Sequence, residues 1–385
     1  MKILFFIRSL DVGGSQRQLT LLARGLAQRG HDVAVAVLYS GTAAEKALEQ
    51  AGVRVVSFDK GGRWDLSPLW RLWRLFRTER ADVVYPFLTT QTTLAALMVP
   101  RAISRLVFGV RSAAMELNNY DFLSTLMFRL EALLSRRADL VIVNAEAART
   151  DAVARGLPPD RIAVVANGID TDAMRPDRDA GRAQRAAWGL DDRAFVIGMV
   201  ARLDPMKDHR NFIAAAAAFA QARPDARFVC IGDGPPAYRQ ELAAQAQSQG
   251  VAERLVWTRE ATDLPTAYNA FDVATLSSAF GEAFPNVIGE AMACGVPMVA
   301  TAVGDSAAII GDCGEVVPPR QPQALSAAWM RMRERLERDG DRLKADVRTR
   351  IVARYDVNTM VDRSERLLAA LCAGRPVAAI AAQDR

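Results

Sequence analysis

The sequence predicts an α/β protein with two parallel-sheet domains in tandem, and three observations favour this class. The chain has 385 residues, whereas one compact domain usually needs about 100–200. Half of the residues are hydrophobic and 24% are charged, as in a folded globular protein. Short apolar runs alternate with helical patterns in two successive series, which is typical of doubly wound parallel sheets.

The first series occupies residues 1–166, which we predict to be one domain. Its opening apolar run has no small-residue cleavage site after it, so we expect a buried strand and not a secretion signal. A turn at Gly13-Gly14 follows, and then a helix to about Gly30. The predicted strands are Ile3–Ile7, Val33–Leu38, Val53–Phe58, Val83–Tyr85, Leu106–Gly109, Leu140–Val143 and Ile162–Val165.

A polar stretch with Gly, Pro and Asp, residues 167–192, is predicted to be a hinge. The second series covers residues 193–355 and predicts another Rossmann-like sheet. A helical stretch over about 356–375 comes after that sheet is complete, and we expect the Ala-rich end Val377–Arg385 to be loose. The predicted strands are Phe195–Val200, Phe228–Ile231, Leu255–Trp257, Val273–Leu276 and Met298–Thr301, with helices centred near Ala215, Leu242, Ala267, Ala291 and Met330.

The composition excludes several classes of protein. The four cysteines are far apart and there are only two histidines, which disfavours a disulfide framework, a zinc site and a Ser-His-Asp hydrolase. We therefore expect a reducing cytoplasm. Residues 1–165 contain 22 basic and 15 acidic residues, a net charge of +7, and the remainder has 27 and 29, a net charge of −2. This asymmetry favours an anionic partner, but no zinc, helix-turn-helix or RNA-binding signature supports a nucleic acid.

Two cations follow the first strand of the second domain. Arg202 and Lys207 flank a turn at Pro205, and a helix is expected to start near His209. Basic side chains beside a helix N-terminus predict a diphosphate pocket, because the amide donors and the macrodipole act with them. Two solvated loop cations are the alternative, since exposed basic residues are common. The turn at Gly232, after the next strand, permits close approach to a ligand but is a weak signal alone.

The strongest signal is the segment from Ser278 to Pro297. Glu282 lies in a loop, and Glu290 lies just over one turn inside a helix whose first turn suits Pro285. The two carboxylates are expected along one wall of a cleft, where Glu290 could hold both hydroxyls of a ribose and Glu282 the hydroxyls of a donor sugar. An exposed helix start with incidental glutamates is the alternative.

These residues resemble a known family, the retaining GT-B glycosyltransferases of family 4, also called glycosyl transferases group 1. The resemblance covers nearly the full chain, and its motifs occur in the family's order. The matching positions are Glu282 and Glu290 for the E-x7-E motif, Arg202 and Lys207 for the diphosphate-binding pair, Asn167-Gly-Ile-Asp170 for the interdomain hinge, and Gly13-Gly14 for the N-terminal glycine loop.

The resemblance implies a fold and a site. Its two domains face each other across a cleft, and its final helix crosses back onto the first domain. Many relatives carry a histidine after the fifth strand that touches the donor sugar; residues 108–116 contain none here, and Arg111 is the nearest candidate. The expected catalytic residues are Arg202, Lys207 and Glu282, and the expected donor-binding residues are Gly13, Gly14, Arg111, Gly232, Arg259, Gly281, Ala283, Phe284, Pro285, Asn286, Val287 and Glu290.

The resemblance also implies a reaction. A hexose-type sugar moves from a UDP- or GDP-sugar to a hydroxyl acceptor, with no metal or other cofactor. The cations stabilise the leaving diphosphate, the acceptor attacks on the same face, and the departing phosphate takes the proton. The acceptor is expected to be lipid-linked, in the assembly of bacterial surface polysaccharides or glycolipids.

Residues 69–77 predict where such an enzyme meets a membrane. Trp70, Trp73 and Phe76 alternate with arginines at every third position. Aromatic and basic side chains together suit a helix lying on anionic lipid, so we expect a peripheral protein on the inner face of the cell membrane. A crossover helix whose aromatic side chains pack on the sheet is the alternative.

Other classes of enzyme are the alternatives to this family. A nucleotide-dependent oxidoreductase needs G-x-G-x-x-G after its first strand, and the turn here lacks it. A P-loop ATPase is excluded because G-x-x-x-x-G-K-[ST] does not occur. A sugar-nucleotide epimerase or a phosphorylase of the same fold would share the motifs.

Overall fold

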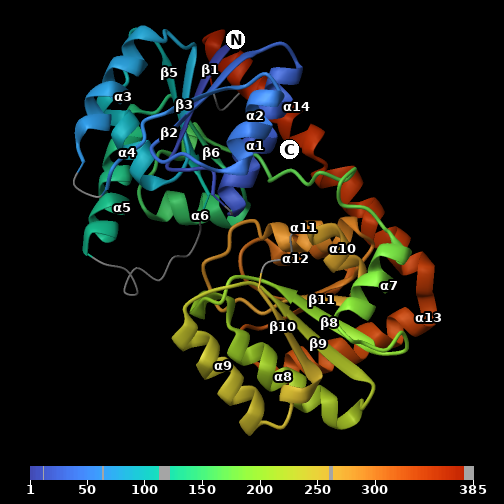
Figure 1. Cartoon of the computed structure of the whole chain (residues 1–385). Helices are drawn as coiled ribbons and strands as arrows, with labels where there is room; N and C mark the ends of the chain where they lie inside the picture. Colours follow the sequence, from blue (N-terminus) through green and yellow to red (C-terminus); the bar gives the residue numbers. More distant parts are fainter. Residues whose placement is uncertain (12, 63–64, 112–121, 260–262, 377–385) are drawn as a thin grey trace. The chain divides into compact units, whose positions relative to one another are not determined.

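The chain forms two compact units in the computed structural model, which describes residues 1–11, 13–62, 65–111, 122–259 and 263–376 (Figure 1). The first unit consists of Met1–Gly168 together with Val357–Arg385, and the second of Ile169–Asp356. Each unit is described by itself below. The predicted loose end, Val377–Arg385, lies outside the described residues.

The first unit is built on a seven-stranded parallel sheet with the order β3-β2-β1-β4-β5-β6-β7. In its register, Ile3 pairs with Val33 on one side and with Val83 on the other. The strands other than the edge strand β3 are mostly buried because helices cover both faces. Their bounds are β1 (Lys2–Ile7), β2 (Asp32–Val37), β3 (Arg54–Ser57), β4 (Val83–Pro86), β5 (Arg105–Val110), β6 (Leu140–Val143) and β7 (Ile162–Val164).

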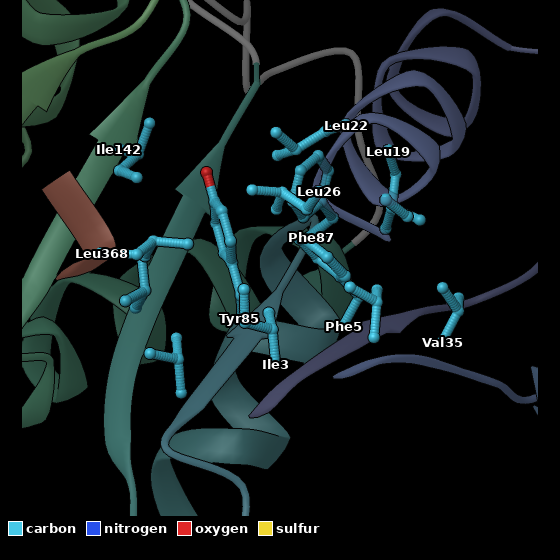
Figure 2. Packing of buried hydrophobic residues seen from close by; sticks show 14 of the residues in the cluster. Ile3, Phe5, Leu19, Leu22, Leu26, Val35, Tyr85, Phe87, Ile142 and Leu368 are labelled. Carbon is cyan, nitrogen blue, oxygen red and sulfur yellow. The ribbon is translucent and has the colours of Figure 1, made fainter. Parts of the chain in front are cut away.

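Alternate residues of β1 contribute to two different layers. Ile3 and Phe5 belong to a buried cluster with leucines of α1 and α14, which Figure 2 shows at close range. Phe6 points to the other face and meets Phe76 of α3 edge-on, with ring centroids 6.0 Å apart. The helices of this unit are α1 (Gly14–Gln28), α2 (Ala43–Gln50), α3 (Ser67–Thr78), α4 (Thr89–Met98), α5 (Phe122–Leu134), α6 (Glu146–Ala154) and α14 (Val357–Cys372).

The last helix, α14, returns to the first unit, as expected from the sequence. It packs against α1 at Gly25, where a Cβ atom would lie only 2.6 Å from the Val361 side chain. At the edge of this contact, Arg29 donates to Glu365 at 2.8 Å, and His31 Nε2 lies 2.7 Å from the other oxygen of the same carboxylate. A close apolar contact and a charged cluster therefore hold the helix in place.

The second unit is built on a six-stranded sheet with the order β10-β9-β8-β11-β12-β13, again with parallel pairs. Trp329 of α13 is fully buried among Phe212, Phe219 and Phe228, and its indole donates to Thr275 Oγ1 at 2.9 Å. The strands are β8 (Phe195–Val200), β9 (Ala226–Ile231), β10 (Leu255–Thr258), β11 (Val273–Leu276), β12 (Met298–Thr301) and β13 (Glu315–Val317). The helices are α7 (Arg178–Ala187), α8 (His209–Ala222), α9 (Pro236–Ser248), α10 (Leu264–Asn269), α11 (Asn286–Ala293), α12 (Ser306–Ile310) and α13 (Pro322–Tyr355).

The structure differs from the predicted hinge and from the predicted elements of the second domain. The expected hinge, 167–192, contains α7, and the boundary between the units falls at Gly168 and Ile169. Helix α7 belongs to the second unit and packs closely against the end of α10. At Gly181 a Cβ atom would lie 2.2 Å from the Asn269 carbonyl oxygen. The short strand β13 and helix α12 were not predicted. Helix α13 is interrupted at Gly340, which has a φ of 47°.

No helix among the described residues is long and apolar enough to cross a membrane.

Candidate active site

The two sheets share a feature that places candidate residues close together. In each sheet the strand order reverses between two neighbours, β1 and β4 in the first unit and β8 and β11 in the second. Ligands of open α/β sheets bind outside the carboxyl ends of the strands at such a point. The loops that carry Lys207 and Glu282 follow β8 and β11, so the topology of the second unit brings them side by side.

Lys207, which is half-buried, forms an ion pair with the buried Glu282. Lys207 Nζ donates to Glu282 Oε1 at 2.5 Å, and the exposed fractions of the two side chains are 17% and 8%. Ser278 Oγ donates to the same oxygen at 2.7 Å. Two donors therefore hold the Glu282 carboxylate, and one of them is a cation.

Hydrogen bonds also connect the backbones of these two loops. Ser277 Oγ lies 2.9 Å from the Lys207 carbonyl oxygen, to which it donates, and Ala279 N donates to the Met206 carbonyl oxygen at 2.8 Å. Lys207 ends a short 3-10 helix, Pro205–Lys207. The loop containing Lys207 thus has little freedom to move away from Glu282.

Helix α8 begins at His209, as the sequence predicts. Its N-cap is Asp208, which has a φ of 50° and accepts from Asn211 N at 3.2 Å. Burial raises the pKa of the Asp208 carboxyl, although the hydrogen bond from Asn211 acts in the opposite direction. Arg202 lies apart from this group: its side chain is 73% exposed, and its ionic contact is with Asp204 at 3.7 Å. The structure therefore joins Lys207 to Glu282 and leaves Arg202 at the surface.

Glu290 lies on the buried side of α11. Tyr268 of α10 donates its hydroxyl to Glu290 Oε2 at 2.9 Å, and both residues are 5% exposed or less. The hydrogen bond fixes one oxygen of the carboxylate within the second unit. Pro285 stands immediately before the first helical residue, Asn286, one position earlier than the first-turn place that the sequence suggested.

Gly232 and Gly234 serve the fold in a way that the sequence analysis did not foresee. A Cβ atom at Gly232 would lie 2.0 Å from the Ala201 carbonyl oxygen, and one at Gly234 would lie 2.4 Å from that of Leu203. Both glycines therefore let the backbone after β9 approach the loop of Arg202 closely. This close approach involves the neighbouring loop of the chain itself.

The remaining expected donor-binding residues of the second unit have diverse surroundings. Phe284 is 6% exposed and packs edge-on against Tyr355, with ring centroids 5.3 Å apart, so its side chain belongs to the core of the unit. Ala283 is buried, and its carbonyl accepts from Asp305 N at 2.9 Å. Gly281 has a φ of 79°, Asn286 and Val287 are half-buried, and Arg259 is exposed. The next residue, Glu260, lies outside the described residues.

In the first unit, Gly13 and Gly14 stand at the start of α1. Gly13 is the N-cap and accepts from Arg17 N at 3.0 Å, and Gly14 is the first helical residue. Arg111 follows β5 and donates to the Tyr85 hydroxyl at 3.1 Å and to Asn167 Oδ1 at 3.3 Å. The other residues of the segment that lacks the family histidine, 112–116, lie outside the described residues.

Sequence reasoning missed several residues that support the site. Tyr268 lies outside the acidic motif, and nothing in its spacing indicates that its hydroxyl reaches Glu290. Ser278 starts that segment, and its sequence context does not indicate that its hydroxyl donates to Glu282. Gly304 was not singled out, yet a Cβ atom there would lie 2.5 Å from the Ala283 carbonyl oxygen. Within the described ranges, no three His, Cys, Asp or Glu side chains cluster as metal ligands.

The chain folds into two doubly wound parallel units, and solved structures with this architecture match it. The crystal structure of Anabaena Alr3699/HepE in complex with UDP-glucose has a TM-score of 0.83 and 25% sequence identity, over 96% of this chain and 100% of that chain. The fold is therefore GT-B, the fold of a large class of glycosyltransferases, as the sequence predicted.

Two family models cover most of the chain. One, described as "Glycosyltransferase Family 4", matches residues 12–173, and the other, "Glycosyl transferases group 1", matches residues 194–335. The chain belongs to this family of glycosyltransferases.

Curated relatives match part of the chain. A D-inositol 3-phosphate glycosyltransferase of Mycobacterium sp. (strain JLS) is 38% identical over 174 residues, which are 43% of this chain and 38% of the relative. A GDP-mannose-dependent alpha-(1-6)-phosphatidylinositol monomannoside mannosyltransferase of Mycolicibacterium smegmatis is 34% identical over 171 residues, 42% of this chain and 44% of the relative. The matched segments thus span less than half of these relatives.

Proposed function

We propose that this protein transfers a hexose-type sugar from a nucleoside-diphosphate donor to a hydroxyl group of an acceptor. The observation that carries the proposal is the ion pair of Lys207 with the buried Glu282 at the strand-order reversal of the second sheet. It lies in the part of the chain that the group 1 model matches, near the ends of β8 and β11. The solved Anabaena neighbour was crystallised with UDP-glucose, a donor of this chemical class.

In the proposed reaction Lys207 stabilises the negative charge that develops on the leaving diphosphate. An ammonium group has three donors, so the bond to Glu282 leaves it able to bind a phosphate oxygen as well. The N-terminus of α8 adds backbone amides two residues further on. Arg202, exposed and on the same loop, is proposed to bind the diphosphate when the donor enters.

The two glutamates are proposed to hold the donor's hydroxyl groups. Tyr268 fixes Oε2 of Glu290, which orients that carboxylate for a bidentate contact with a ribose. Lys207 and Ser278 share Oε1 of Glu282, which orients that carboxylate toward the sugar. Because neither glutamate acts as a nucleophile, we propose that the acceptor attacks on the face that the diphosphate leaves, with retention of configuration, and that the diphosphate takes the acceptor's proton. No metal is needed in this scheme.

The test compares sugar transfer by Lys207→Ala with that of the wild-type protein. Loss of one donor to the developing charge is expected to cost about 2–4 kcal/mol in transition-state stabilisation, which lowers kcat and leaves folding intact. Lys46→Ala, which removes an exposed lysine of the first unit, is the control. Unchanged transfer by Lys207→Ala would refute the proposed role.

A radiolabelled UDP- or GDP-sugar identifies the reaction class in the same experiment. Transfer predicts a labelled acceptor, retention of the anomeric configuration and activity that persists in EDTA. An epimerase would convert the donor without any acceptor, and a phosphorylase would require inorganic phosphate.

We further propose that the acceptor is lipid-linked and that α3 lies on the inner face of the cell membrane. Its inward side chains Leu72 and Phe76 are buried, whereas Trp70 and Trp73 are 61% and 38% exposed. Arg77 lies over the Trp73 ring at 4.2 Å. Exposed indoles beside guanidinium groups suit the interface of an anionic bilayer. Such a location fits the assembly of surface polysaccharides or glycolipids from the cytoplasmic side.

A vesicle flotation assay tests this surface. Wild-type protein is expected to float with vesicles that contain anionic lipid, and the double variant Trp70→Ser/Trp73→Ser is expected to lose most of this binding. Val352→Ser, which removes an exposed apolar residue from the second unit, is the control. Equal flotation of wild type and the double variant would rule out α3 as the contact.

A further inference from the structure

Arg111 is a charged residue whose partners within the described ranges are all uncharged. It directly follows β5, at the carboxyl end of the first sheet, and is half-buried. Its guanidinium donates to the Tyr85 hydroxyl and to Asn167 Oδ1, and it lies over the Phe87 ring at 4.3 Å from the centroid. None of these three groups carries a negative charge.

The two aromatic side chains that contact Arg111 are buried in the core of the first unit. Tyr85 and Phe87 are fully buried and pack against each other, with ring centroids 4.9 Å apart. Figure 2 shows Tyr85 extending through the core, with its hydroxyl at the end where the neighbouring strand arrows point. Gly109 makes this packing possible, because a Cβ atom there would lie 2.9 Å from the Pro86 carbonyl oxygen and 3.1 Å from the rings of Tyr85 and Phe87.

Asn167 is positioned from the other side by α1. The buried Gln18 side chain donates to the Gly168 carbonyl oxygen at 2.8 Å and accepts from Gly168 N at 2.8 Å. This pair of bonds fixes the backbone next to Asn167. Residues from β4, β5, α1 and the segment after β7 therefore converge to hold one guanidinium in a defined position.

The charge of Arg111 is not compensated within the described part of the chain. The two hydrogen bonds of Arg111 in that part go to uncharged groups, and its Nε is buried without a hydrogen-bond partner there. Burial raises the pKa of Tyr85, which keeps that hydroxyl neutral, although the nearby Arg111 acts in the opposite direction. A partly buried charge without a counter-ion is costly, so a protein that builds one gains most when an anion binds to it.

We propose that Arg111 is the recognition site for a phosphate group carried by the acceptor substrate. A planar guanidinium with several N–H donors suits phosphate oxygens better than an ammonium does. The site is made entirely of residues of the first unit, separate in sequence from the Lys207 and Glu290 loops. The inference rests on the proposed function and adds to it that the acceptor carries a phosphate group.

The test measures binding of inorganic phosphate to the full chain by calorimetry, with UDP or GDP present at saturation to occupy the second unit. Arg111→Gln removes the charge and is expected to weaken phosphate binding by about tenfold or more. Arg111→Lys keeps a charge and is expected to retain part of the binding. Arg105→Gln, at the opposite end of the same strand and with the same change of charge, is expected to leave phosphate affinity unchanged.

The outcomes separate this inference from the proposed function. Phosphate affinity that is equal in Arg111→Gln and the wild type overturns the inference, as does a loss equally large in Arg105→Gln. Weaker UDP or GDP binding by Arg111→Gln, with phosphate binding unchanged, would assign the residue to the donor and also overturn it. Failure of the wild-type protein to bind any nucleoside diphosphate would instead refute the proposed function. If Arg111→Gln does not fold, Tyr85→Phe, which removes one support of the guanidinium, is expected to weaken phosphate binding by about threefold.

Discussion

His209, the first residue of α8, lies directly after the loop that carries Lys207 and is fully buried. Burial lowers its pKa to about 4, and the charge of Lys207 acts in the same direction. Neither ring nitrogen has a hydrogen-bond partner among the described residues. The folded protein therefore holds a neutral imidazole, and protonation would place an unpaired charge beside Lys207.

The first prediction concerns the pH dependence of stability. The pKa of His209 falls from 6.5 to about 4 on folding, so above pH 6.5 the imidazole is neutral in both the folded and the unfolded state and protonation costs no stability. As the pH falls from 6.5 to 4, the unfolded state binds a proton more readily, and the free energy of unfolding declines by roughly 3 kcal/mol. In urea titrations His209→Leu is expected to fold at pH 7 and to lose much of this slope. A variant that keeps the full slope would show that another group causes it.

The second prediction concerns Tyr268. In Tyr268→Phe, Glu290 loses the hydrogen bond to Oε2 while the ring continues to fill the core. We expect the KM for the nucleotide sugar to rise by about five- to tenfold, with a smaller change in kcat, because the bond orients a group that holds the donor. Steady-state kinetics check this, and Tyr238→Phe, in the first turn of α9, is the control. A fall in kcat at constant KM would contradict a role in positioning Glu290.

At the scale of the elements, the charged cluster on α14 makes a prediction of its own. Hydrogen bonds from Arg29 and His31 hold the pKa of the Glu365 carboxyl below its usual value of 4.5. The stability that this carboxylate contributes is therefore present above pH 4.5 and is lost as the pH falls through the lower folded-state pKa.

Glu365→Gln is expected to lower the free energy of unfolding at pH 7 by about 0.5–1 kcal/mol, a small effect because solvent screens the pair. Its effect should disappear in strong acid. Glu241→Gln, which disrupts a pair whose side chains are both more than half exposed, is the matched control and should change stability less. Chemical denaturation at pH 7 and pH 3 measures both, and an equal loss at the two pH values would contradict the electrostatic explanation.

The elements also show where sequence patterns were sufficient. Strands such as β1 and β8 are continuous apolar runs, so their burial in a parallel sheet could be predicted. Strand β13 has only three residues, of which Glu315 and Val316 are half-buried, and such a short run gives no pattern of its own. Helix α7 was assigned to a hinge because its sequence is polar and contains Gly181. That glycine is what lets the helix approach Asn269 closely.

At the scale of the whole molecule, the residues that we propose to bind the donor and the residue that we propose to bind the acceptor's phosphate belong to different units. Lys207, Glu282 and Glu290 lie in the second unit, and Arg111 lies in the first. The cleft between the domains stays a prediction of the sequence analysis. The proposed diphosphate-binding residues Arg202 and Lys207 lie in the second unit, so we expect binding of a nucleoside diphosphate to stabilise that unit by mass action.

Hydrogen exchange with and without UDP or GDP tests this division. We expect slower exchange at the loops of Lys207 and Glu282, and at the start of α11, with little change in β1, β4 and β5. The same measurement on Lys207→Ala is the control and should show weaker protection. Protection confined to the first unit would show that the donor site has been placed in the wrong half of the chain.

The sequence by itself predicted the fold class, the two-domain order and the acidic and basic motifs, and the resemblance of those motifs to a known family predicted the family. Fold class and motifs are local information, because apolar periodicity and residue spacing need no knowledge of distant contacts. Only the tertiary structure decided that Lys207 pairs with Glu282, that Tyr268 holds Glu290, and that Tyr85 and Asn167 hold Arg111. Each of these contacts joins segments that are far apart in the chain. Which of them meet depends on strand order and side-chain packing, and neither leaves a pattern in the local sequence.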